Sequence, residues 1–169
     1  MNRYFSRRKV KLRRKSSNIQ IYYDRQFPLE DIVNVFYPLF HADYSYDSLL
    51  DMINTADHIF CAYDETQRRC VGCALIKSTP RTSGLYISLF GVDQSSQQRG
   101  IGTRLLKQII HWAYRTYHNF IYLHVHVMNY KAIGLYEKVG FQADDYVSDF
   151  YYATSKQQPD AYRMVLYLQ

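Results

Sequence analysis

The sequence of 169 residues has no hydrophobic run of the ~18 residues that a membrane-spanning helix needs. Its first residues are basic but have no apolar segment after them, so we expect no secretory signal. It has only three cysteines, an odd number without the spacing of a disulfide framework. The length suits one domain with a real core. These absences favour a single intracellular domain with reduced thiols.

A metal site is not expected. Cys70 and Cys73 have the spacing of half a zinc site, but there is no second pair. Both lie in a segment that reads as a strand, where residues three apart point to opposite faces. His124 and His126 could chelate a metal, but the sequence suggests no further ligand nearby. The sequence therefore predicts structural thiols and no metal.

Acidic residues are missing from the first 16 positions, which hold eight of the 21 lysines and arginines. The formal charge of +6 belongs to this part, because the remaining chain has 13 basic against 15 acidic residues. We assign residues 1–17 to a basic, flexible arm and residues 18–169 to the folded domain. Such an arm can bind ribosomal RNA, anionic lipid or an import receptor, or it can be a solvated segment without a dedicated partner.

What the sequence has in abundance is aromatic residues, including 18 tyrosines, which suit a tight core and an amphipathic groove. Strand patterns cover residues 18–23, 58–63, 70–77, 85–92, 119–128, 141–152 and 161–168. Helix patterns cover residues 28–38, 47–53, 101–113 and 129–140. We expect Pro38 to end the first helix, Asn129 to cap the last one and Gly140 to follow its end. A single α/β domain is predicted.

Residues 97–106, QQRGIGTRLL, place Gly100 and Gly102 between a predicted strand and a predicted helix. This order creates an anion site, because the first amides of a helix lack intrahelical partners and glycine lets a phosphate approach the backbone. The segment is not a P-loop, since Gly-Thr-Arg replaces Gly-Lys-Ser/Thr, nor a dinucleotide fingerprint, since Leu105 stands at the third glycine. A plain helix start with glycines for close packing is the alternative.

The pattern Gln97-x-x-Gly100-x-Gly102 resembles the pyrophosphate loop of the Gcn5-related N-acetyltransferase (GNAT) family. The resemblance extends over residues 18–168 and is strongest in the second half. It is carried there by Tyr122-Leu123-His124-Val125 and by Asn129-x-x-Ala132-Ile133-x-x-Tyr136-x-x-x-Gly140-Phe141. It implies the GNAT fold, a mixed, mostly antiparallel sheet of about seven strands flanked by about four helices. It also implies acetyl-CoA as cosubstrate.

Within that family the chain resembles the protein N-terminal α-acetyltransferases of the NatE and NatF catalytic type. The residues that carry this narrower match are Leu85-Tyr86-Ile87, Tyr151-Tyr152 and the ending YRMVLYL. One departure is Phe40-His41-Ala42-Asp43-Tyr44, which lacks the proline of the family's Phe-Pro-Val/Ile-x-Tyr segment. That departure affects the expected peptide preference more than the expected activity.

The resemblance assigns roles to residues. It implies that Tyr86 and His124 are general bases acting through ordered water, and that Tyr136 either protonates the departing thiolate or only packs. The cofactor would be held by Phe90, Gly91, Val92, Gln97, Gln98, Arg99, Gly100, Ile101, Gly102, Thr103, Asn129 and Tyr136. The peptide would be held by Phe40, Tyr44, Ser88, Tyr151 and Tyr152.

Strand periodicity bears on the catalytic pair. It places Tyr122, His124 and His126 on one face of their strand. It also places Tyr86 on one face with Ser88, Phe90 and Val92. Taken alone, His124 would read as a strand histidine bonded to a neighbour.

The expected activity is direct acetyl transfer from acetyl-CoA to the free N-terminal amine of proteins, with Met-starting termini favoured by an aromatic pocket. An α-amine has a pKa of about 7.7–8.0 against about 10.4 for lysine, so it needs less help from a base. The alternatives are acetylation of lysine or a small amine, and a non-catalytic module docked through the basic arm. We expect a cytoplasmic protein, whose arm could serve ribosome or RNA association, an auxiliary subunit or nuclear entry.

Overall fold

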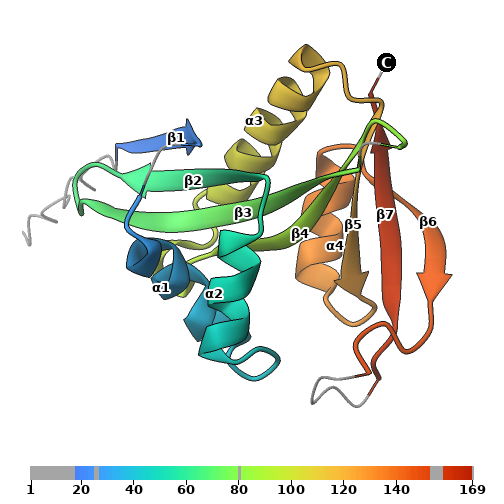
Figure 1. The fold of residues 1–169 in the computed structure, drawn as a ribbon, viewed down its shortest axis with the longest axis horizontal. Helices are drawn as coiled ribbons and strands as arrows, with labels where there is room; N and C mark the ends of the chain where they lie inside the picture. The colour runs from blue at the N-terminus through green and yellow to red at the C-terminus, as the bar shows by residue number, and fades with distance from the viewer. Residues whose placement is uncertain (1–17, 25–26, 80, 153–157, 169) are drawn as a thin grey trace, which may run out of the picture.

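The computed structural model describes residues 18–24, 27–79, 81–152 and 158–168 (Figure 1). The predicted basic arm, residues 1–17, lies outside the described residues. The strands are β1 (Ile19–Tyr23), β2 (His58–Asp64), β3 (Arg69–Thr79), β4 (Gly84–Val92), β5 (Phe120–His126), β6 (Gln142–Val147) and β7 (Ala161–Tyr167). The helices are α1 (Leu29–Phe40), α2 (Tyr46–Asn54), α3 (Ile101–Arg115) and α4 (Tyr130–Lys138), with a 3₁₀ turn η1 (Gln94–Ser96). No helix of the described ranges is long and apolar enough to span a membrane.

The strands form one sheet in the order β1-β2-β3-β4-β5-β7-β6. Only β4 and β5 pair in parallel, and α3 makes the crossover between them, while all other neighbours are antiparallel. The predicted α/β fold with seven strands and four helices is therefore confirmed for the described residues. The parallel pair lies at the centre of the sheet, and this position decides where the site forms.

Two apolar clusters hold the helices against the sheet. The larger one joins Leu105 and Ile109 of α3 to strand residues such as Leu85 and Ile121, all fully buried. The other joins α1 and α2 to β2, β3 and the second half of β4. In Figure 1, α1 and α2 lie together on one side of the sheet, and α3 crosses the far side. Apolar residues at helical spacing explain this arrangement, because each helix buries one stripe.

The ends of the elements follow the sequence with two exceptions. Asn129 accepts a hydrogen bond from the backbone N–H of Ala132, and Gly140 adopts a φ of +103°, so both predicted helix boundaries are confirmed. The prediction that Pro38 ends α1 is wrong, because the helix continues to Phe40. Because proline has no N–H, the helix continues past Pro38 without the hydrogen bond that an N–H there would donate to the carbonyl oxygen of Asn34. The last predicted strand before β7 also stops early, at Val147.

Three β-bulges interrupt the alternation of side chains. The pairing registers skip Val71 in β3, Ser88 in β4 and Asp144 in β6. A bulge inserts one extra residue and shifts all following side chains to the other face of the strand. Each of these bulges therefore changes which residues meet, and two of them shape the site.

Because of the bulge at Val71, the expectation that Cys70 and Cys73 point to opposite faces of their strand is wrong. Cys70 and Cys73 lie on the same face, together with Cys61, and the three sulfur atoms lie within 4.8 Å of one another. All three cysteines are buried and none forms a disulfide among the described residues, and burial raises the pKa of the Cys73 thiol. The Sγ atoms of Cys61 and Cys73 are 3.2 Å apart. The thiols form part of the apolar cluster beneath α1.

Gly134 offers a simple test of the helix α4. A Cβ added there would meet no atom within 4 Å, and the backbone has helical geometry. We expect Gly134→Ala to raise the free energy of unfolding by about 0.5–1 kcal/mol, because alanine loses less backbone entropy on folding. Chemical denaturation measures this change, and a destabilised variant would contradict it.

Candidate active site

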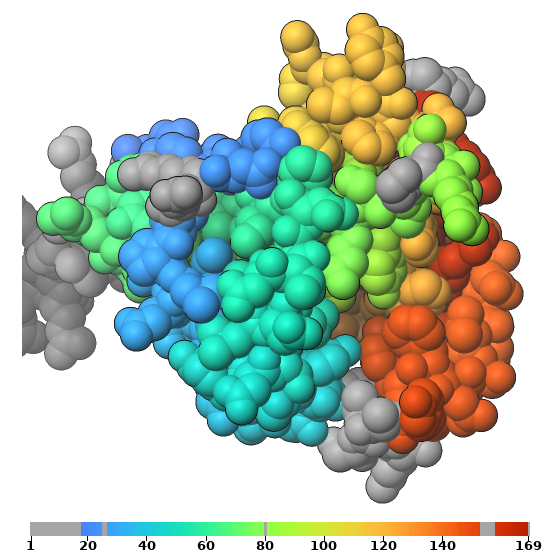
Figure 2. All heavy atoms as spheres, viewed as in Figure 1, coloured from blue at the N-terminus to red at the C-terminus, as the bar shows by residue number. Residues whose placement is uncertain are grey.

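The central strands β4 and β5 separate and leave a cleft between them. They pair only from Gly84 to Ile87 against Phe120 to Leu123. Beyond that point, within the described residues, the edge of β4 that faces β5 has no strand partner. A cleft of about 700 Å³ opens there, lined by β4, β5, the start of α3, α4 and the connection between α1 and α2. Figure 2 shows a hollow between α2 and the segment of β6 and its following turn.

The bulge at Ser88 divides β4 into two halves. Leu85 and Ile87 pack into the cluster with α3, but Leu89 packs into the cluster with α1. Phe90 consequently turns toward Tyr136 of α4, with ring centroids 6.0 Å apart. The prediction that Tyr86, Phe90 and Val92 share a face is therefore wrong, because it assumed an uninterrupted strand.

The glycine loop, residues 97–103, presents unpaired backbone amides to the cleft. Gly100 is the N-cap of α3 with a φ of +76°, a left-handed conformation that favours glycine, and no side chain caps the helix there. A Cβ at Gly102 would lie 3.1 Å from Leu135 Cδ2, so close packing explains this second glycine. The side chain of Gln97 is held by the carbonyl oxygen of Val92 at 3.0 Å. Free first-turn amides and the helix dipole make this loop suited to a phosphate group.

Most of the residues predicted to bind the cofactor line this cleft. From β4, the loop and the first turn of α3 they are Phe90, Gly91, Val92, Gln97, Gln98, Gly100, Ile101, Gly102 and Thr103. Asn129 and Tyr136 also line the cleft, whereas Arg99 does not. Lys131, Ala132 and Leu135 line it as well and were missed, although they lie on the same helix as Tyr136. Lys131 adds a positive charge that suits phosphate.

His124 is the residue of the cleft best suited to accept a proton. Its Nδ1 lies 3.4 Å from the hydroxyl oxygen of Tyr86, and its ring stacks on Phe150 at 4.1 Å. Burial, and after it the charge of Arg163, lower the pKa of His124 below its usual value of 6.5. The imidazole is therefore neutral at pH 7 and has a free lone pair. Phe150 was missed by sequence reasoning, since nothing marks it among the neighbouring aromatic residues.

His126 shares the predicted face with His124, but both of its ring nitrogens are hydrogen-bonded. Its Nδ1 accepts a hydrogen bond from the backbone N–H of Met128 at 3.1 Å, and its Nε2 donates to the carbonyl oxygen of Gln158. Neither nitrogen is available for a reaction or for a metal. The alternation of β5, with Ile121, Leu123 and Val125 buried on the other face, agrees with the sequence prediction.

Tyr86 lies behind His124 rather than on the cleft wall. Its ring stacks on Tyr122 at 4.8 Å, and burial raises the pKa of its phenol to about 12. A phenol with this pKa keeps its proton near neutrality, and its oxygen can accept a hydrogen bond from Nδ1–H of His124. Of the predicted pair of bases, only His124 is therefore free to take up a proton at pH 7.

The opposite end of the cleft is aromatic. Phe40, Tyr44, Ser88 and Tyr151 line it, together with Leu39 and Asp43, which were missed. Tyr151 donates a hydrogen bond to the carbonyl oxygen of His124 at 3.3 Å, which ties this wall to β5. Tyr152 does not reach the cleft and is 81% exposed. Burial raises the pKa of both Tyr44 and Tyr151, so these rings present an uncharged surface.

Tyr136 lines the cleft from α4. It is only 7% exposed and contacts Phe90 and Phe141 edge-on. Burial raises the pKa of its phenol above the ordinary range, so it retains a proton. This geometry is compatible with both predicted roles, donation of a proton and packing.

Comparisons with known proteins identify the fold and the family. Residues 27–141, more than half of the chain, match the sequence model of the acetyltransferase (GNAT) family. N-alpha-acetyltransferase 50 of Danio rerio is 27% identical over 125 residues, which cover 73% of this chain and 72% of that protein. A Bacillus subtilis acetyltransferase in complex with CoA superposes with a TM-score of 0.74 at 20% identity, covering 89% of this chain and 99% of the other. Arabidopsis thaliana NAA60 in complex with a bisubstrate analogue gives a TM-score of 0.72 at 20% identity, covering 89% and 99%.

The family match includes α1, the split strands and the glycine loop, and it ends where β6 begins. The solved structures agree with the same sheet and helices over nearly their whole length. On this evidence the chain belongs to the GNAT family and is an acetyl-CoA-dependent N-acetyltransferase.

Proposed function

We propose that this protein acetylates the free N-terminal amine of peptides and proteins, with methionine-starting termini as its preferred substrates. The observation that carries the proposal is one cleft with two distinct ends. Unpaired amides at Gly102 and Thr103 lie at one end, and the aromatic rings of Phe40, Tyr44 and Tyr151 lie at the other. The neutral His124 lines the same cleft between them.

Acetyl-CoA, when bound, supplies an acyl group activated as a thioester. In our mechanism the amides of the glycine loop and Lys131 bind its phosphates. The unpaired edge of β4 at Phe90–Val92 orients the acyl end and offers backbone N–H groups to the oxygen on which negative charge develops. Tyr136, which keeps its proton, faces the cleft and would donate it to the sulfur as the amine nitrogen bonds to the acyl carbon and the C–S bond breaks; the proton that the new amide nitrogen releases would then restore the phenol.

His124 takes the proton from the substrate ammonium at Nε2, directly or through one water, while its Nδ1–H donates to the hydroxyl oxygen of Tyr86. A histidine whose pKa lies below 6.5 is matched to an α-amine, whose pKa of about 7.7–8.0 leaves a sizeable neutral fraction at pH 7. A lysine amine, with its pKa of about 10.4, would be neutral about 200 to 400 times less often at pH 7. The base in this cleft therefore favours N-termini.

The aromatic end of the cleft supports a preference for methionine followed by an apolar residue. Its rings are uncharged and half-buried, and apolar burial stabilises such side chains in proportion to the area covered.

The proposal is tested by acetylation of a peptide panel with radiolabelled acetyl-CoA. We expect turnover of a Met-Leu peptide with a free N-terminus, and at least tenfold lower kcat/KM for a peptide whose first residues are Gly-Glu. Blocking the N-terminus of the Met-Leu peptide, with an internal lysine left free, should abolish labelling. Labelling of that lysine, or turnover of spermidine alone, would overturn the assignment.

A further inference from the structure

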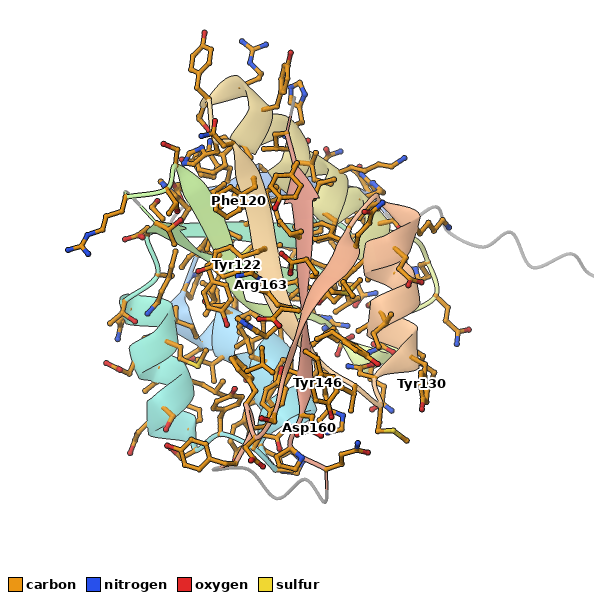
Figure 3. All side chains as sticks on the ribbon, turned by 90° about the vertical axis from the view of Figure 1, so that its right-hand side faces the viewer. Phe120, Tyr122, Tyr130, Tyr146, Asp160 and Arg163 are labelled. Carbon is orange, nitrogen blue, oxygen red and sulfur yellow. The ribbon has the colours of Figure 1, made fainter. Side chains whose placement is uncertain are left out.

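His124 faces a charged pair that the proposed mechanism leaves unused. β5 and β7 are antiparallel, and His124 is directly opposite Arg163 in their register. Directly opposed residues share a face of the sheet, with Cβ atoms about 4.5–5.5 Å apart. Figure 3 shows Arg163 on β7 near Tyr122 of the adjoining strand β5. The guanidinium therefore lies on the same surface as the imidazole.

Asp144 fixes this guanidinium. Nε of Arg163 donates to Oδ1 of Asp144 at 2.9 Å, and Nη2 donates to Oδ2 at 2.5 Å. Two parallel hydrogen bonds of this kind define both the place and the plane of the arginine. The bulge in β6 creates the pair, because the register passes from Ala143 to Asp145 and leaves Asp144 as the extra residue. Arg163 is therefore bonded to Asp144 and lies opposite Asp145 in the register.

The other titratable groups around His124 come from β4, from β5 itself and from the turn after β6. They are Tyr86, Tyr122, His126 and Tyr151. Burial raises the pKa of the Tyr86 and Tyr151 phenols, so both keep their protons near neutrality. Nδ1 of His126 accepts a hydrogen bond from the backbone N–H of Met128. Among the described residues, the charges that act on His124 are those of Arg163, Asp144 and Asp145.

We propose that Arg163 and Asp144 are a positioning pair that sets the proton affinity of His124 through opposite charges placed on its face of the sheet. Arg163 disfavours the imidazolium, and Asp144 both holds Arg163 in place and offsets part of its effect. The catalytic meaning of this pair rests on the proposed function, but its effect on His124 does not. The lowering of the His124 pKa by Arg163 and its raising by Asp144 and Asp145 agree with this geometry.

The decisive experiment follows the imidazole of His124 by NMR during a pH titration of the full-length protein. We expect Arg163→Met to raise the pKa of His124 by about 0.5–1 unit, because Asp144 and Asp145 then act on it without a counter-charge. Asp144→Asn should lower it by a similar or smaller amount. The double variant should return to within about 0.3 unit of the parent, because the two effects have opposite signs. These shifts should shrink in 1 M salt, since the pair is partly exposed.

Two controls separate charge from structure. Arg163→Lys keeps the charge but not the two parallel hydrogen bonds, so it should hold the pKa of His124 nearer the parent value than Arg163→Met does. Arg69→Met breaks the ion pair with Asp93, which has similar exposure, and should leave the pKa of His124 unchanged. The acid limb of kcat/KM should move with the NMR value in every variant.

An unchanged pKa in both single variants, or shifts of the same sign, would overturn the proposal. So would a drop in stability for Arg163→Met with no change at His124, because that result assigns the pair a structural role only. Should the protein fail to acetylate any N-terminus, the NMR titration still decides the inference. Failure of the proposed function and failure of the pair are therefore distinguishable.

Discussion

Replacing His124 with phenylalanine is expected to lower kcat for acetyl transfer by about 100- to 1,000-fold, because a positioned general base contributes a factor of this size. Phenylalanine keeps an aromatic ring to stack on Phe150, so the loss isolates the imidazole nitrogens from the packing of the ring. Steady-state kinetics on the Met-Leu peptide measure the change, and circular dichroism checks that the fold is kept.

The pH dependence follows from the same group. Protonation disables the base, so activity should fall as the pH drops through the pKa of His124, which lies below 6.5. Above that pH the imidazole is neutral, and activity should rise only with the neutral fraction of the substrate amine. In the phenylalanine variant the limb caused by His124 should vanish. His111, an exposed residue of α3, provides a matched control as His111→Phe. A His124→Phe enzyme with more than a third of the parent kcat would rule out the assignment.

Gly102→Val is expected to weaken coenzyme A binding by about 100-fold. The new side chain branches at a point where even a Cβ lies 3.1 Å from Leu135 Cδ2, so its methyl groups crowd the cleft beside the first amides of α3. The loss corresponds to one or two hydrogen bonds to a charged phosphate, each worth about 1.5–3 kcal/mol. Isothermal titration calorimetry with coenzyme A measures the dissociation constant directly.

Gly134→Ala is the matched control for this substitution. Both glycines lie in helices beside the cleft, but a Cβ at Gly134 meets open space and Gly134 does not line the cleft. Its affinity for coenzyme A should equal that of the parent protein. A Gly102→Val protein that binds coenzyme A within about twofold of the parent, with its fold intact, would remove the glycine loop from the binding site.

Much of the fold follows from the sequence because its local signals are strong. The apolar stripe of α3 includes Leu105 and Ile109 at helical spacing, and both are fully buried. Asn129 and Gly140 mark the ends of α4 through a side-chain acceptor and a left-handed backbone. The glycines were correctly placed where the chain enters a helix, with Gly100 as the N-cap of α3 and Gly102 in its first turn, although packing, not phosphate alone, explains Gly102.

The bulges lay beyond the sequence signals. Ser88 and Asp144 have no adjacent glycine or proline that would mark an extra residue, and Gly72 beside Val71 was not read as such a mark, so alternation was read straight through all three. One inserted residue exchanges the two faces of everything after it. That single cause put Phe90 on the wrong face and Cys70 opposite to Cys73.

The sequence also failed to indicate two residues that contact the site from turns. Phe150 and Asp43 reach His124 and the cleft only because the chain folds back after β6 and after α1. A local sequence pattern does not show which residues distant in the chain come together in the fold. Tyr152 illustrates the reverse case, since it follows a cleft residue in sequence and still points to solvent.

The extra residue in β4 has a bearing on how such an enzyme can diversify. In the proposed mechanism Tyr86, which precedes it, lies beside the base that takes the amine proton, whereas Phe90 and Val92, which follow it, hold the donor. Substitutions in β4 before Ser88 can change which amine is preferred without changing the binding of acetyl-CoA. The residues of β4 after the bulge can therefore stay the same while those before it vary. This suits a fold that uses one acetyl donor with many different acceptor amines.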